Sequence, residues 1–339
     1  MDRKAFLESI RKGTVSGVYL LHGTDETLKT DALNTLRKAL LPEGFEQLNG
    51  QELEKPDANT VISACETLPF MADKRLVLVR EQPGFSAKGK EAEPEDSLLD
   101  YLPHVPTSTV LVFFHRGKAD GKRKLTTAIK KAGAEVLIDP LKGDELNAYA
   151  VSCAADCGST MDPVTASKLV FTCGADAGIL EQEVRKLAAA AGAGQPITPA
   201  LIDALATRSL ECKVFDMINA MMAGNRTGAF QLLEDLLKNG EKQLGILAML
   251  LRQYRMLQHV QIMRHDRLPD QEILQRMGYS GKNAWMGNQL MRQAAKLGNR
   301  QIREAVRICL DTELKAKSGQ INEEGSVETA MLRIFALNG

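Results

Sequence analysis

Five short apolar runs, all within the first 140 residues, constrain the fold of this 339-residue chain more than any other feature. The runs are Val18–His22, 45–49, Arg75–Arg80, Thr109–Phe114 and 135–139. They are rich in leucine and β-branched residues, as is typical of strands that are buried on both faces. Helical patterns separate them, at about 26–40, 57–66, 95–102 and 119–132. This alternation predicts an α/β domain with a parallel sheet between helices.

After about residue 140 the strand signal ends and only helical patterns remain. These patterns cover 143–157, 163–172, 175–191 and 198–207, and then 211–223, 226–238, 241–266, 283–297, 299–317 and 326–337. The sequence therefore predicts an α/β domain at 1–140 and two all-α domains at 141–208 and 209–339. In the long pattern at 241–266, we expect one apolar stripe to lie in the core. The stripe consists of Leu244, Leu247, Leu251, Tyr254 and Leu257.

Composition excludes several classes of protein. Lys plus Arg and Asp plus Glu each number 43, so the net charge of zero argues against a strongly basic DNA-coating protein. Aromatic residues make up 5%, too few for a base-stacking platform. No apolar run approaches about 18 residues, and the N-terminus does not resemble a signal peptide, so we expect a cytoplasmic protein. The scattered cysteines are then free thiols. Cys153 and Cys157 could form half a metal site, but no second ligand pair follows, so we expect no metal and no cofactor.

A loop that resembles a phosphate-binding motif follows the first apolar run. Gly23, Lys29 and Thr30 fit the pattern G-x-x-x-x-G-K-[ST], between a strand and a helix as the motif requires. Leu28 replaces the second glycine, and its side chain would obstruct the approach of a phosphate. Acidic residues also lie where an anion would bind, at Asp25 and the position after it. The sequence favours an ordinary strand-to-helix turn, with weak vestigial nucleotide binding left as an alternative.

A magnesium-binding carboxylate is missing from the two other strands that could supply it. In an ATPase of this type, an aspartate follows such an apolar run, but Arg80 follows the run 75–79 here. The run 109–114 ends in His115 and Arg116. A cation cannot ligate Mg²⁺. Two parts of an ATPase site are therefore absent together, and we expect no intrinsic ATPase activity.

The residues Leu68, Pro69, Phe70 and Met71 follow the predicted helix at 57–66 without hydrophobic alternation. Pro69 lacks an amide donor and disfavours helix at the residue before it. The apolar side chains could therefore project from the end of the helix, or they could turn inward against the sheet. Further along, residues 82–96 are rich in Pro, Gly and charges and are expected to form a loop.

Several segments together resemble the bacterial DNA polymerase III delta subunit family. The first is YLLHGTDETLKTDAL at 19–33, and the second is ETLPFM at 66–71 followed by DKRLVLV at 73–79. Weaker matches are GADAGIL with EVRKL at 174–187, GNR with AFQLL at 224–233, and LD with LK at 310–315. Two positions depart from the family pattern: Met71 replaces a second phenylalanine, and Thr27 replaces an aromatic residue. The order of the segments over nearly the whole chain carries the resemblance.

The resemblance implies an AAA+-like N-terminal domain with an inactive nucleotide site, a helical lid and a C-terminal bundle for clamp-loader assembly. It implies a subunit that binds the ring-shaped beta sliding clamp and helps to open it, in a complex with tau/gamma and delta-prime subunits in which neighbouring subunits hydrolyse ATP. The clamp-binding hydrophobic residues of the family map onto Leu68, Pro69, Phe70 and Met71. The rival function is a divergent stand-alone AAA+-type P-loop ATPase. A weaker alternative is a helical adaptor whose α/β domain binds another protein.

A basic stretch at 116–131 includes Lys122, Arg123 and Lys124. In the assembled complex these residues could face primer-template DNA. They could equally form a solvated helix face.

Overall fold

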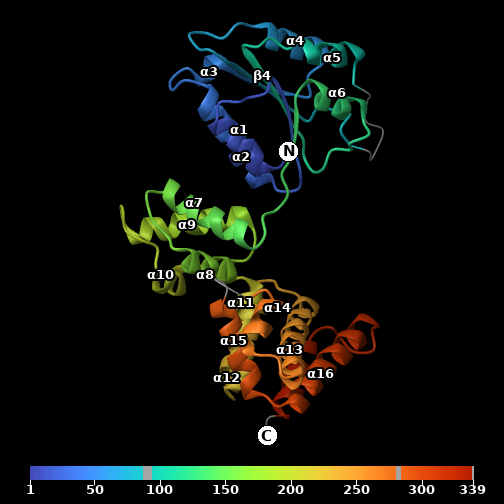
Figure 1. Cartoon of the computed structure of the whole chain (residues 1–339). Helices are drawn as coiled ribbons and strands as arrows, with labels where there is room; N and C mark the ends of the chain where they lie inside the picture. Colours follow the sequence, from blue (N-terminus) through green and yellow to red (C-terminus); the bar gives the residue numbers. More distant parts are fainter. Residues whose placement is uncertain (87–93, 280–283, 338–339) are drawn as a thin grey trace. The chain divides into compact units, whose positions relative to one another are not determined.

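The computed structural model describes residues 1–86, 94–279 and 284–337, and the chain divides into two compact units, Met1–Leu141 and Lys142–Gly339 (Figure 1). The boundary lies one residue beyond the predicted end of the α/β domain. Much of the loop expected at 82–96 lies outside the described residues.

Within the described residues of the first unit, five parallel strands form one sheet in the order β2-β3-β4-β1-β5. The strands are β1 (Val18–His22), β2 (Gly50–Glu54), β3 (Arg75–Arg80), β4 (Thr109–Phe114) and β5 (Ala134–Leu137). Strands β1 and β4 are buried along their whole length, as their apolar sequences predict. The predicted α/β class, with a parallel sheet followed by helices, is confirmed.

Helices cover both faces of this sheet (Figure 1). They are α1 (Arg3–Arg11), α2 (Glu26–Leu40), α3 (Glu46–Asn49), α4 (Ala58–Glu66), α5 (Asp96–Tyr101) and α6 (Lys124–Ala132), with a 3₁₀ turn at Leu102–His104. Helices α4, α5 and α6 pack on the face that carries Leu20, Val77 and Phe113. Helix α1 packs against the opposite face, where the Phe6 and Tyr19 rings lie 5.1 Å apart. The carboxyl ends of β1 and β4 therefore come together at one edge, at the start of α2.

The strand predicted at 45–49 is wrong. Residues Glu46–Asn49 form the short helix α3, and the strand follows it at Gly50–Glu54. Strand β2 lies at the edge of the sheet and has a largely polar sequence, so it lacked the apolar signal used for the other strands. The start of α6 was also predicted too early, because Asp120 accepts the amides of Lys122 and Arg123 in a turn before the helix begins.

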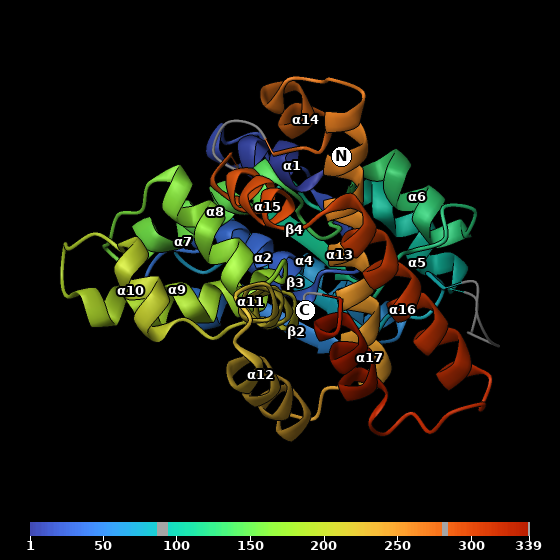
Figure 2. The same cartoon turned by 90° about the horizontal axis from the view of Figure 1, so that it is seen from below.

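The second unit contains only helices in its described residues. They are α7 (Asp144–Asp156), α8 (Pro163–Cys173), α9 (Ala177–Ala191), α10 (Pro199–Leu205), α11 (Leu210–Met222), α12 (Arg226–Lys238), α13 (Gln243–His265), α14 (Asp270–Arg276), α15 (Ala284–Lys296), α16 (Asn299–Lys317) and α17 (Ser326–Phe335). Helix α14 was not predicted. Helix α13 runs beside α16 in the centre of the C-terminal bundle (Figure 2). Leu247, Tyr254 and Leu257 of its predicted stripe are in the core, whereas Leu244 and Leu251 are half-buried.

Within this unit, contacts join helices on the two sides of position 208, the expected boundary between the two all-α domains. The Phe171 ring of α8 lies 5.6 Å from the ring of Phe215 in α11 and 5.4 Å from the ring of Trp285 in α15. Trp285 also donates its indole N–H to Oγ of Ser167 at 3.2 Å. Trp285 is therefore a packing residue that ties α15 to α8.

Candidate functional site

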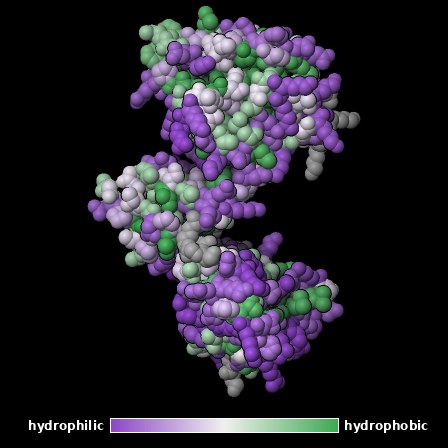
Figure 3. Space-filling view, viewed as in Figure 1, coloured by the Kyte–Doolittle hydropathy of each residue, from purple (hydrophilic) through white to green (hydrophobic). Residues whose placement is uncertain are grey.

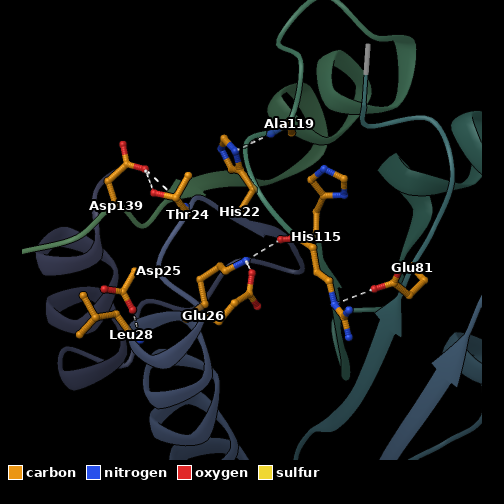
Figure 4. Close-up of polar contacts among 11 residues, drawn as sticks. His22, Thr24, Asp25, Glu26, Leu28, Glu81, His115, Ala119 and Asp139 are labelled. Carbon is orange, nitrogen blue, oxygen red and sulfur yellow. Dashed lines mark hydrogen bonds and ion pairs between the residues drawn. The ribbon is translucent and has the colours of Figure 1, made fainter. Parts of the chain in front are cut away.

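The loop after β1 carries the residues that match the phosphate-binding pattern. Figure 4 shows polar contacts made by Thr24, Asp25 and Leu28 in this region. Gly23 has a φ of 131°, and a Cβ at this position would lie 1.9 Å from the carbonyl oxygen of Ile138. The Gly23 amide donates to the carbonyl oxygen of Gly117 at 2.8 Å. The Thr24 amide donates to Oδ1 of Asp139 at 3.4 Å, and its hydroxyl donates to the same oxygen at 3.2 Å. These amides already have acceptors within the protein.

The N-terminus of helix α2 is capped by the chain itself. Asp25 is the N-cap residue, and its Oδ1 accepts the amide of Leu28 at 2.9 Å. The amide of Asp25 donates to the carbonyl oxygen of Ile138 at 3.5 Å. A phosphate-binding loop uses free amides at this helix end to hold its anion. Here a carboxylate takes that position, and the Leu28 side chain fills the space behind it without any solvent exposure.

Lys29, the lysine of the pattern, is fully buried. Its ammonium donates to Oε1 of Glu26 at 2.6 Å and to the carbonyl oxygen of His115 at 2.7 Å. It also lies 4.9 Å from the centre of the Phe114 ring. The ammonium therefore joins α2 to the end of β4, and Thr30, the next residue of the pattern, is exposed on the helix.

Arg80, at the end of β3, occupies the expected position of a metal-binding carboxylate. Its guanidinium lies 4.6 Å from the centre of the Phe114 ring and forms an ion pair with Glu52 of β2. Burial acts to raise the pKa of Glu52, but hydrogen bonds from Arg80 and Arg37 outweigh it and lower that pKa. Among the described residues, no group of three or more His, Cys, Asp or Glu side chains could hold a metal ion.

His22, the last residue of β1, is buried beside this loop. Its Nδ1 accepts the amide of Ala119 at 3.0 Å, and its Nε2 lies 3.4 Å from Oε1 of Glu135. Burial lowers the pKa of His22, and the opposing effect of the Glu135 carboxylate does not outweigh it. Because Nδ1 is an acceptor, the neutral ring carries its proton on Nε2.

The segment after α4 presents its apolar side chains to solvent. Leu68, Phe70 and Met71 are 78%, 53% and 75% exposed, and Pro69 is half-buried. Hydrophobic residues elsewhere form small separate areas on a mostly hydrophilic surface, in the view of Figure 3. Of the two arrangements that the sequence allowed, the projecting one is therefore the one observed. Three large exposed apolar side chains in four residues indicate a protein-binding surface.

Asn49, which is buried, bonds directly to this segment, and the buried Arg75 joins the two neighbouring helices α3 and α4. Oδ1 of Asn49 accepts the amide of Phe70 at 2.7 Å, and Nδ2 of Asn49 donates to the carbonyl oxygen of Phe70 at 2.9 Å. Arg75 donates from Nε to the carbonyl oxygen of Ala64 in α4 at 3.0 Å and from a terminal nitrogen to that of Leu48 in α3 at 3.2 Å. The segment is therefore fixed to α3 as well as to α4.

Sequence reasoning missed Asn49, because it placed 45–49 in a strand. It also missed Leu48, the residue before Asn49, which is 54% exposed. Strand β2 begins at Gly50 directly after Asn49, so the Asn-Gly pair does not form a turn here and gave no local signal for this role of Asn49.

The three basic residues singled out at 122–124 lie at the start of α6. Lys122 and Lys124 are exposed, and Arg123 is half-buried and donates from Nε to the carbonyl oxygen of Gly84 at 3.4 Å. Cations at a helix N-terminus are not favoured by the helix dipole, so their placement does not serve the stability of α6.

All six cysteines are free thiols, of which Cys157 is exposed and the others are buried. In the part of the chain that the structure describes, no helix is long and apolar enough to cross a membrane.

Comparisons with known proteins agree over most of the chain. The family model described as "DNA polymerase III, delta subunit" matches residues 19–138, and that described as "DNA polymerase III delta subunit, C-terminal domain" matches residues 211–334. The DNA polymerase III subunit delta of Bacillus subtilis is 28% identical over 256 residues, which is 74% of each chain.

A solved structure shows the same fold. The Bacillus subtilis DNA clamp loader delta protein has a TM-score of 0.55 and 24% identity, over 98% of this chain and 99% of that one. A DNA polymerase III gamma subunit-related protein from Thermotoga maritima, at 14% identity, has a TM-score of only 0.33 over 87% of this chain and 99% of that one. The two family models match parts of both structural units, and together with the curated relative they show that the chain belongs to the DNA polymerase III delta subunit family.

Proposed function

We propose that this chain is the clamp-loader subunit that binds the ring-shaped sliding clamp of DNA polymerase III and helps to open it. The clamp can then be loaded on primed DNA during replication. Leu68, Phe70 and Met71 would enter an apolar pocket on the clamp, with Pro69 shaping the turn between them. The observation that carries this proposal is their exposure on a segment that Asn49 holds by two hydrogen bonds.

Burial of these side chains supplies free energy for binding. A Leu or Phe side chain contributes roughly 1.5–3 kcal/mol when it moves from water into an apolar pocket. Such anchors are typical binding hot spots. A fixed segment loses little conformational entropy when it binds, so more of this free energy appears as affinity.

Clamp opening requires that these contacts differ between the closed and open rings. A ligand shifts a conformational equilibrium only by the difference in its affinity for the two states. If the pocket on the clamp fits Leu68 and Phe70 better in the open ring, binding holds the ring open without any chemical step on this chain.

We further propose that the chain hydrolyses no ATP and acts as a non-catalytic subunit of a DNA polymerase holoenzyme. The amides of Gly23, Thr24, Asp25 and Leu28 are bonded within the protein. The Lys29 ammonium is likewise engaged by Glu26 and His115. This geometry disfavours the rival function of a stand-alone P-loop ATPase. ATP would then be hydrolysed by neighbouring subunits.

The other clamp-loader subunits in this proposal are tau/gamma and delta-prime, and the helical bundle expected at 209–339 would serve assembly with them. Residues 141–208 would act as the lid domain of an AAA+-like module. Lys122, Arg123 and Lys124 would face primer-template DNA inside the complex. Such a replication subunit would work in the cytoplasm.

The test is binding of the purified chain to the sliding clamp of the same organism without nucleotide. The double variant Leu68→Ala/Phe70→Ala is compared with Leu310→Ala/Leu314→Ala. The control leucines are 55% and 67% exposed on α16 and lie in the other unit. The control therefore removes a comparable amount of exposed apolar surface.

Nucleotide-free binding that only the first variant loses would support the proposed function and its site. Equal binding by the two variants would contradict the assignment of the site to 68–71. A folded wild-type chain that binds only with ATP would instead favour the rival ATPase.

A further inference from the structure

We infer that Asn49 is a positioning residue that sets the binding geometry of Phe70. This inference rests on the proposed function, because it concerns how the clamp-binding segment is presented. Its structural basis is the side-chain amide of Asn49, which is fully buried and closes a ring of two hydrogen bonds with the backbone of Phe70.

The contact joins two parts of the chain that are 21 residues apart in sequence. Nδ2 of Asn49 also donates to the carbonyl oxygen of Phe45 at 3.2 Å, so one side chain ties Phe70 to the start of α3. The rings of Phe45 and Phe70 lie 6.3 Å apart, which limits the directions in which the Phe70 ring can point. Asn49 thus fixes the backbone of Phe70 while Phe45 guides its side chain.

The backbone after Phe70 shows why such a tie is needed. Met71 has a φ of 48°, a left-handed conformation that costs free energy for a residue with a side chain. A strained residue keeps its conformation only where the surrounding structure determines it. The bonds from Asn49 to Phe70 are the fixed contacts immediately before this residue. Without them, Met71 would relax and the Phe70 side chain would lose its fixed direction.

Alternative side chains cannot supply both bonds. An aspartate at position 49 would accept the Phe70 amide but could not donate to the Phe70 carbonyl. A leucine has the same branching and the same number of side-chain heavy atoms but forms neither bond. Asn49→Leu therefore removes the tie without opening a large cavity. Asn49→Asp provides a second variant that removes only the donor, should the leucine variant fail to fold.

The first measurement is hydrogen exchange of the amides at 67–72 in the free protein. Positioning by Asn49 predicts faster exchange there in Asn49→Leu. The control Ile129→Val removes one methyl group from the core of the same unit, away from the segment, and should leave this exchange unchanged. Unchanged exchange in Asn49→Leu would overturn the inference, whether or not the chain binds a clamp.

The second measurement is a double-mutant cycle of clamp affinity with Phe70→Ala. If Asn49 acts through Phe70, Asn49→Leu weakens binding by about tenfold in the wild-type background. It changes binding by at most about twofold once Phe70 is already alanine. An equal loss in both backgrounds would overturn the inference, because Asn49 would then act on stability alone. A Phe70→Ala variant that binds as tightly as wild type would instead contradict the proposed function, and the exchange measurement would still decide the role of Asn49.

Discussion

Replacing Lys29 by methionine separates the two roles that a lysine at this position of the motif can have. In a nucleotide-binding loop the ammonium waits for a phosphate, so its removal abolishes binding and leaves the free protein stable. In this structure the ammonium is already engaged by Glu26 and by the His115 carbonyl. We therefore expect Lys29→Met to destabilise the nucleotide-free protein.

The magnitude follows from what the substitution leaves behind. Methionine keeps the apolar stem that packs in the core, so the cavity is small. The Glu26 side chain is 53% exposed and regains water when its partner is lost. The His115 carbonyl loses a buried donor, which costs about 1–3 kcal/mol for an unsatisfied polar group. Removal of a buried charge offsets part of this cost, so the expected loss is about 1–2 kcal/mol.

The assay is urea unfolding of wild type, Lys29→Met and the control Lys38→Met. Lys38 lies on the same helix but is exposed, so its substitution should change the free energy of unfolding by less than about 0.5 kcal/mol. The same curves are recorded with Mg-ATP. A site at which ATP is present at about 100 times its Kd would stabilise the protein by about 2.7 kcal/mol. We expect no such shift in the wild-type chain.

A Lys29→Met protein as stable as wild type would refute this reasoning, because the ammonium would then contribute nothing to the fold. Stabilisation of the wild type by Mg-ATP, lost in Lys29→Met, would show that the loop still binds nucleotide. Stabilisation by ATP that survives the substitution would place nucleotide binding elsewhere in the chain.

Three further outcomes follow from the structure. Leu68→Ala/Phe70→Ala should cost about 2–4 kcal/mol of clamp-binding free energy, measured by titration. This range is roughly 1.5–3 kcal/mol for the complete burial of each side chain, scaled by the exposed fractions of 78% for Leu68 and 53% for Phe70. A loss below about tenfold in Kd would contradict it. Because the pKa of His22 is lowered from 6.5, its neutral form stabilises the fold above pH 6.5, and that stability is lost as the pH falls through the lowered pKa. His22→Asn should therefore flatten the pH dependence of unfolding in this range, and identical profiles would rule the effect out. Trp285→Phe loses the bond to Ser167 and should destabilise the second unit by about 1 kcal/mol in thermal denaturation followed by circular dichroism, since the variant lacks the only tryptophan; an unchanged midpoint would show that this bond contributes nothing.

The sequence predicted those parts of the fold that are governed by burial. Runs such as Thr109–Phe114 are apolar at every position because both faces of their strand are covered. Strand β2 was missed because an edge strand does not need apolar residues, and Glu52 serves there as an ion-pair partner instead. Helix α14 was missed because it is only seven residues long and buries a single residue, Ile273, so it has no apolar stripe to detect.

The sequence was informative about the nucleotide-binding loop where a single residue departs from what such a loop requires. Leu28 and Arg80 each exclude one part of a nucleotide site without any knowledge of the fold. The exposure of Leu68 was not predictable, because spacing after a helix does not tell whether a side chain points inward or outward. The role of Asn49 was not predictable either, because its partner Phe70 is brought to it only by the packing of α3 beside the end of α4.

The first glycine of the loop has a consequence for how such sequences evolve. Any side chain at Gly23 would collide with the backbone of Ile138, and its φ of 131° is rarely adopted by other residues. Selection for folding alone is thus enough to keep this glycine, and the bonds of the buried Lys29 ammonium to Glu26 and His115 do the same for Lys29. A lineage can therefore lose a ligand while the residues that once recognised it persist as structural parts. In such a chain, a surviving motif residue reflects ancestry and a structural role, and it does not by itself indicate the present function.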